Sequence, residues 1–270
     1  MASKAKVSIF ATCVVNHLYP NVGMSVSNVL NKLGISTTVE VTQVCCGQPF
    51  FNSGYWSDAR KLGKKFLELY NSVEDDIVIP SGSCTSMIRN HYPDLFEEED
   101  DLLTIIDDVN SRIYEFTEYV SCILENDDRK LDVEKKSSGQ TPKVTYHEAC
   151  HLSRELGIKE GPRNLLNLVD GVEFIEMPKS EVCCGFGGLF SIKFADISSA
   201  MMNEKIDSIR SVDCEFVTSS DSSCLMNIGG GLDKNNIPTK PMHIAEILDK
   251  FILSEKAHEA SNCTVQTKIC

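Results

Sequence analysis

Two stretches of the sequence decide its fold: Val44-Cys45-Cys46-Gly47-Gln48-Pro49 and Val182-Cys183-Cys184-Gly185-Phe186-Gly187. Each adjacent pair of cysteines has one further cysteine upstream and one downstream, at nearly the same distances. The spacings are C-x31-C-C-G-x36-C, from Cys13 to Cys84, and C-x32-C-C-G-x38-C, from Cys150 to Cys224. A pattern of this length that occurs twice indicates that the chain consists of two similar halves.

Short runs of β-branched and aromatic residues precede the cysteines in both halves, and such runs are typical of buried strands. Amphipathic helical patterns lie between them, at Ser57–Tyr70 and Asp196–Ile209. We therefore predict an α/β fold of two repeated, Rossmann-like βαβαβ halves with parallel sheets. The predicted strands are Val7–Phe10, Val39–Val44, Asp76–Pro80, Lys143–Tyr146, Val172–Met177 and Cys214–Thr218.

The predicted sheets bring the cysteines together, although they are far apart in the sequence. Parallel strands joined by right-handed crossovers all end at the same edge of the sheet, and each cysteine of the pattern follows a strand. We expect two groups of four thiols at these edges. They are the first quartet, Cys13, Cys45, Cys46 and Cys84, and the second quartet, Cys150, Cys183, Cys184 and Cys224.

Composition divides the chain further. We predict a first repeat over residues 1–125, a polar linker over 126–142, a second repeat over 143–253 and a mobile tail over 254–270. The acidic run Glu97–Asp101 is expected to be a solvated loop or a helix start, and Met242–Ile252 a closing amphipathic helix.

The charge of the chain indicates which partners to exclude. A net charge of −13 and a pI near 4.9 argue against nucleic acid and against an anionic membrane surface. No apolar run approaches the ~20 residues of a membrane span, and no export signal is visible, so we expect a cytoplasmic protein without a membrane span. In a reducing compartment, twelve cysteines favour metal or redox chemistry over disulfides.

Adjacent cysteines favour an iron–sulfur cluster over zinc. Structural zinc sites space their cysteines two to four residues apart, whereas side chains of neighbouring residues diverge and suit a cluster several ångströms across. His147 and His151 flank Cys150 and could ligate iron or donate hydrogen bonds to a cluster, with a structural role as the alternative. The remaining cysteines are expected to be ordinary thiols: Cys122, Cys214, Cys263 and Cys270.

The motifs around the cysteines resemble the cysteine-rich CCG-domain family of iron–sulfur proteins, and within it the subunits of lactate-utilisation systems. The resemblance runs from about Val7 to Leu248. Two positions differ from relatives in which a C-x-x-C closes each motif, because residue 87 is Met and residue 227 is Asn; Ser222 also replaces a cysteine that similar proteins can carry. The motifs that carry this resemblance are Cys45-Cys46-Gly47-Gln48-Pro49 with Asn52-Ser53-Gly54-Tyr55, Pro80-Ser81-Gly82-Ser83-Cys84, Cys183-Cys184-Gly185-Phe186-Gly187-Gly188, Cys224-Leu225-Met226-Asn227-Ile228-Gly229-Gly230 and Met242-His243-Ile244-Ala245-Glu246.

The resemblance implies an electron-transfer subunit of a three-protein complex that oxidises L-lactate to pyruvate, beside a ferredoxin-like iron–sulfur subunit and a third subunit. It also implies one or two clusters per chain of the 4Fe–4S type, cubane or non-cubane. Other hypotheses stay open: a subunit of an oxidase for glycolate or another 2-hydroxy acid, a thiol/disulfide redox enzyme like heterodisulfide reductase, and a non-redox zinc scaffold. No catalytic residue is predicted.

Overall fold

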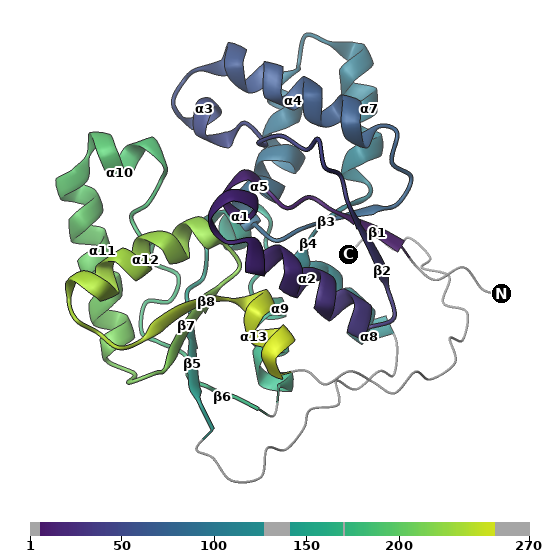
Figure 1. The fold of residues 1–270 in the computed structure, drawn as a ribbon. Helices are drawn as coiled ribbons and strands as arrows, with labels where there is room; N and C mark the ends of the chain where they lie inside the picture. The colour runs from purple at the N-terminus through teal and green to yellow at the C-terminus, as the bar shows by residue number, and fades with distance from the viewer. Residues whose placement is uncertain (1–5, 127–140, 170, 252–270) are drawn as a thin grey trace.

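Each half of the molecule is built on one four-stranded parallel sheet (Figure 1). The computed structural model describes residues 6–126, 141–169 and 171–251. The strand order is β2-β1-β3-β4 in the first sheet and β6-β5-β7-β8 in the second, so the two halves have the same topology. All the pairs are parallel, with Ile9 opposite Val39 and Val78 in the first sheet. The predicted α/β fold with two similar halves is confirmed.

The first half runs from residue 6 to residue 126. Its strands are β1 (Lys6–Ile9), β2 (Ser36–Val39), β3 (Asp76–Ile79) and β4 (Ile113–Glu115). Its helices are α1 (Cys13–Leu18), α2 (Pro20–Lys32), α3 (Gln48–Asn52), α4 (Trp56–Tyr70), α5 (Gly82–Ser86), the π-helical turn η1 (Met87–His91), α6 (Tyr92–Leu95), α7 (Asp100–Asn110) and α8 (Phe116–Asn126).

The second half repeats this strand order, with a shorter connection before its last strand. Its strands are β5 (Lys143–Tyr146), β6 (Glu173–Phe174), β7 (Phe216–Ser219) and β8 (Lys240–His243). Its helices are the π-helical turn η2 (His151–Glu155), α9 (Glu160–Leu168), α10 (Leu189–Lys193), α11 (Ala195–Arg210), α12 (Ser222–Lys234) and α13 (Ile244–Phe251).

The predicted helices and strands agree with these bounds except near the second strand of each half. The prediction of a strand over Val39–Val44 was wrong, because β2 ends at Val39, where its partner β1 also ends, and Val41 is 94% exposed. The run predicted over Val172–Met177 forms only the short strand β6. Each sheet also has a fourth strand that was not predicted, and the second of these takes the first residues of the expected closing helix.

One hydrophobic core is shared by the two halves. It joins strand residues of both sheets, such as Val7 and Val144, through residues of α2, α8, α9 and α13, which lie between the sheets in Figure 1. At its rim the Lys32 ammonium binds the Asp249 carboxylate at 2.8 Å. The outer face of each sheet is covered separately, by α4 and α7 in the first half and by α11 and α12 in the second. The predicted linker 126–142 and tail 254–270 lie almost wholly outside the described residues.

Candidate metal centres

The first quartet of cysteines gathers beyond the carboxyl ends of three strands. Cys13 is the first residue of α1, after β1; Cys45 and Cys46 lie in the loop after β2; Cys84 lies in α5, after β3. The Cys13 and Cys45 sulfurs are 3.5 Å apart, and those of Cys46 and Cys84 are 3.3 Å apart. The sheet edge thus brings all four thiols into one group, as the topology predicts.

The second quartet has the same arrangement in the other sheet. Cys150 follows β5, Cys183 and Cys184 lie in the loop after β6, and Cys224 lies in the first turn of α12, after β7. The thiols also meet in the same order, since Cys183 contacts Cys150 and Cys184, and Cys184 contacts Cys224. The ten cysteines of the described residues are free of disulfides.

A glycine turn sets the direction of each cysteine pair. Gly47 and Gly185 have φ values of 88° and 83°, which lie in the left-handed region that glycine adopts without strain. The turn points each glycine N–H back at a sulfur, with 3.4 Å from the Gly47 nitrogen to the Cys45 Sγ and 3.4 Å from the Gly185 nitrogen to the Cys183 Sγ. Such N–H donors stabilise negative charge on sulfur.

Contacts among the thiols move their pKa values in opposite directions. Hydrogen bonding from Cys13 lowers the pKa of Cys45 to about 3, and hydrogen bonding from Cys150 lowers the pKa of Cys183 to about 2. The same contacts and burial raise the pKa of the neighbouring thiol Cys13. One thiol of each quartet therefore loses its proton readily, whereas the thiol that it contacts keeps its proton. Metal cations would supply the positive charge that further thiolates need.

Asp221 links the loops that carry the last cysteine of each quartet. Its carboxylate is 2% exposed and caps α12, and its Oδ2 accepts hydrogen bonds from the Ser83 N–H at 3.0 Å and the Ser81 hydroxyl at 3.2 Å. Burial opposes ionisation of Asp221, but the hydrogen bonds from Ser223 and Ser83 together outweigh it and lower the pKa of the carboxyl group. Because Ser81 in turn caps the helix of Cys84, the two quartets lie on either side of one hydrogen-bonded contact between the halves.

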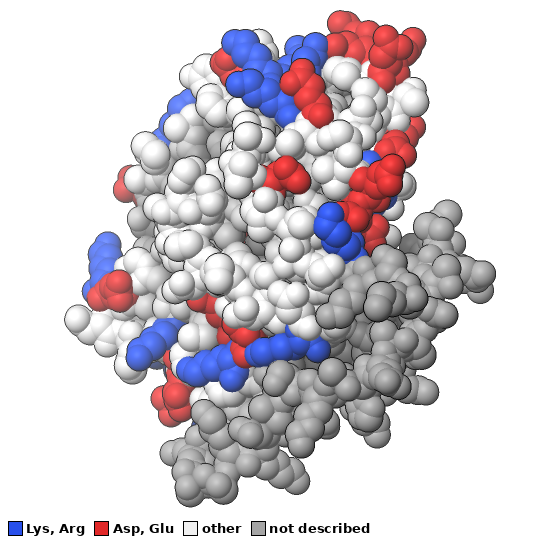
Figure 2. All heavy atoms as spheres, turned by 45° about the vertical axis from the view of Figure 1, so that its right-hand side comes forward, with Lys and Arg blue, Asp and Glu red and all other residues white. Residues whose placement is uncertain are grey.

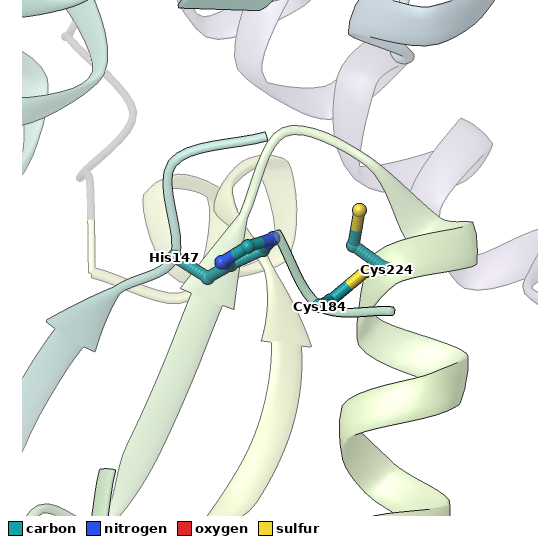
Figure 3. Close-up of side chains that lie close together, drawn as sticks. All are labelled: His147, Cys184 and Cys224. Atoms are coloured by element: carbon teal, nitrogen blue, oxygen red, sulfur yellow. The ribbon is translucent and has the colours of Figure 1, made fainter. Parts of the chain in front are cut away.

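The second site contains a histidine that no hydrogen bond explains. His147 is fully buried, and in the described part of the chain neither of its ring nitrogens has a hydrogen-bond partner. A ligand atom of His147 lies within 4.8 Å of the Cys184 and Cys224 sulfurs, and Figure 3 shows the three side chains converging from separate segments. Burial and the nearby charge of Lys205 lower the pKa of His147 to about 3, so the ring is neutral.

Lys205 places a buried ammonium close to the second quartet. Its side chain has no exposed surface, and its Nζ donates to the carbonyl oxygens of Lys179 at 2.6 Å and Ser180 at 3.0 Å. Burial lowers its pKa to about 8, and the nearby quartet cysteines, Cys184 foremost, oppose this shift. Sequence reasoning missed both Lys205 and Asp221, since their burial depends on tertiary packing.

The other candidate ligands lie at the edge of the sites or away from them. His151 is partly exposed, and its Nδ1 lies 3.6 Å from the Cys150 sulfur. Cys214 is buried just before β7, and Cys122 is half-buried in α8, so neither joins a quartet. Cys263 and Cys270 lie outside the described residues.

Comparison with known proteins identifies the family. The profile of the CCG family, described as a cysteine-rich domain, matches residues 7–89 and 144–229, which are the two repeated segments. The chain belongs to the CCG family. This CCG protein is 39% identical over 245 residues to "Lactate utilization protein A 1" of Bacillus anthracis, covering 91% of this chain and 98% of that protein. It is also 39% identical to "Lactate utilization protein A" of a Geobacillus species, covering 90% of this chain and 99% of that one.

Solved structures are less similar to this CCG protein. An aspartate racemase homologue from Pyrococcus horikoshii aligns over 92% of this chain and 96% of its own, with 12% identity and a TM-score of 0.30. That likeness is too low to indicate a common function.

One face of the CCG protein carries charges of both signs. Figure 2 shows acidic and basic side chains interspersed on the face it presents, with a broad uncharged area between them. No helix of the described residues has the length and apolar character needed to cross a bilayer.

Proposed function

We propose that this chain is an iron–sulfur electron-transfer subunit of a complex that oxidises L-lactate to pyruvate, with one 4Fe–4S cluster in each half. The first quartet would hold one cluster and the second quartet the other. The observation that carries the proposal is the convergence of eight thiols into two equivalent groups at the edges of two equivalent sheets. The name of the relatives, Lactate utilization protein A, supports the choice of substrate.

The residues of both sites fit such a group. Soft thiolates are the ligands that iron–sulfur clusters take, and the first quartet consists of two touching pairs spread over three loops. A single metal ion requires ligand atoms packed close together. Among the described residues, one such group of three lies within 4.8 Å, and it is in the second half: His147, Cys184 and Cys224. When bound, an iron–sulfur cluster supplies one-electron oxidation and reduction.

The contact between the halves supports electron passage within the chain. Hydrogen bonds run from the Cys84 N–H through Ser81 and the Asp221 carboxylate to the N–H of Ser223, the residue before Cys224. Lactate loses two electrons when it becomes pyruvate, and a pair of one-electron sites in one chain suits that need. In this proposal the dehydrogenation of lactate belongs to a partner subunit.

Exposed apolar side chains beside each glycine turn support docking of the ferredoxin-like iron–sulfur subunit and the third subunit. Side chains of this size are rarely left in water without a partner when they group together. Those near the first turn are Phe50, Tyr55 and Trp56, which are 41%, 56% and 53% exposed; those near the second are Ile192, Phe194 and Ile197, which are 76%, 54% and 55% exposed.

The proposal is tested by capturing the tagged chain with its partners from its own cells without oxygen. L-lactate added to the captured complex is expected to bleach the cluster absorption near ~400 nm. Bleaching by glycolate and not by lactate would instead support a subunit of another 2-hydroxy-acid oxidase. A complex that responds to neither, but whose isolated chain reduces a disulfide with a chemical reductant, would favour the heterodisulfide-reductase-like alternative.

A further inference from the structure

The two sites differ at a buried position close to the cysteines. Phe10 and His147 are equivalent, since each is the first residue after its strand, each lies three residues before a quartet cysteine, and each donates its N–H to the neighbouring strand. The acceptors are the carbonyls of Val78, at 3.0 Å, and Thr218, at 2.7 Å. Both side chains are fully buried. The first half therefore has a phenyl ring where the second has an imidazole.

A second pair of equivalent positions differs in the same way. The glycine turns rest against Ala59 in the first half and Ser198 in the second, and seven residues further along the helices stand Phe66 and Lys205. Phe66 packs edge-on against Phe10, with ring centroids 5.0 Å apart. An apolar pair beneath the first quartet is thus replaced by an imidazole and an ammonium beneath the second.

Packing alone does not explain the imidazole. A buried polar atom without a partner costs about 1–3 kcal/mol, and proteins rarely leave one in that state. The Ser180 carbonyl lies near the ring, but it makes no hydrogen bond of good geometry with either ring nitrogen and already accepts from the Glu148 N–H at 3.1 Å and the Lys205 Nζ at 3.0 Å. A carbonyl oxygen has two lone pairs, and both are in use. The ring nitrogens therefore point to a partner bound between His147, Cys184 and Cys224 (Figure 3).

We propose that His147 is a nitrogen ligand of the metal group in the second half, so that this site is of mixed thiolate and imidazole type while the first site is of thiolate type alone. The inference rests on the proposed function only in taking that group to be an iron–sulfur cluster. The His147 imidazole would join the four thiolates of the second quartet as a further ligand without adding negative charge, and the nearby Lys205 ammonium would stabilise the added electron. The second site would therefore be reduced before the first.

The decisive experiment uses protein labelled with ¹⁵N-histidine, purified and reduced without oxygen, and measured by electron–nuclear double resonance. Cys46→Ser removes the first cluster and Cys184→Ser the second, so each variant reports on one site. The expected result is a strongly coupled histidine nitrogen in Cys46→Ser and in the unmodified protein, and none in Cys184→Ser. A cluster signal in Cys46→Ser without that coupling overturns the inference and leaves the proposed function standing.

Two substitutions identify which histidine is responsible. His147→Phe copies the first half and is expected to abolish the nitrogen coupling, while His151→Phe, beside Cys150 at the edge of the site, is expected to keep it. Loss of the coupling in His151→Phe and not in His147→Phe overturns the inference. If His147→Phe fails to fold, the labelled Cys46→Ser protein still decides. A preparation with no iron contradicts the proposed function and this inference together.

Discussion

The glycine turns of the two sites should differ in their tolerance of alanine. A Cβ added at Gly185 would lie 2.6 Å from the backbone oxygen of Ser198, whereas one at Gly47 would lie 3.3 Å from that of Ala59. Both residues have a left-handed φ, which costs alanine about 1–2 kcal/mol. The closer contact adds about 1–3 kcal/mol of overpacking. We expect Gly185→Ala to lower the free energy of unfolding by about 2–5 kcal/mol and Gly47→Ala by about 1–2 kcal/mol.

Anaerobic urea unfolding followed by circular dichroism measures these differences. Gly54→Ala is the matched control, since Gly54 has a φ of 81° and a Cβ there would meet nothing within 4 Å. It isolates the cost of the left-handed backbone from the cost of the contact. Gly185→Ala should also lose iron from the second site, because relief of the contact moves the turn that carries Cys183 and Cys184. The reasoning is refuted if Gly185→Ala is no less stable than Gly54→Ala.

Three further substitutions test the roles of buried ionisable residues. Burial raises the pKa of Glu115 from 4.5 to about 8, so the folded protein keeps a proton that the unfolded chain has lost, and stability should fall as the pH rises from 4.5 to 8. At about 1.4 kcal/mol per pH unit the full fall is about 5 kcal/mol, and urea unfolding of Glu115→Gln across this range should not show it. Lys205→Met should lower the reduction potential of the second cluster alone, as followed by a redox titration; an equal shift at both clusters would contradict the assignment of its charge. Asp221→Ala should cost about 1–3 kcal/mol for each donor it leaves buried, including the Ser83 N–H, and urea unfolding should give a smaller loss for Ser223→Ala.

The repeat of the cysteines was enough to predict most of the fold. Strand runs such as Asp76–Pro80 and helical periods such as Ser57–Tyr70 reflect local burial patterns, which a sequence carries directly. The run Val39–Val44 has the composition of a strand, but no neighbouring strand extends far enough to pair with it. Strand β4 has only three residues, too few to show a strand pattern in the sequence, so its pairing with β3 defines it.

The candidate sites were predictable in their cysteines and not in their surroundings. Topology alone brings Cys13, Cys45, Cys46 and Cys84 to one edge, because strand ends of a parallel sheet coincide. The environment of His147 depends on which helix residue packs near it, and the sequence alone does not predict that this residue is Lys205. The link through Asp221 depends likewise on how the two halves meet.

Iron and acid-labile sulfide per chain, measured on oxygen-free preparations, test the central claim most directly. If each quartet holds its own 4Fe–4S cluster, the unmodified protein contains about eight iron and about eight sulfide, and Cys46→Ser and Cys184→Ser each retain about four of both. Cys122→Ser, outside both quartets, should keep the full content. Zinc in place of iron, or the loss of all iron from either single substitution, would contradict two independent cluster sites.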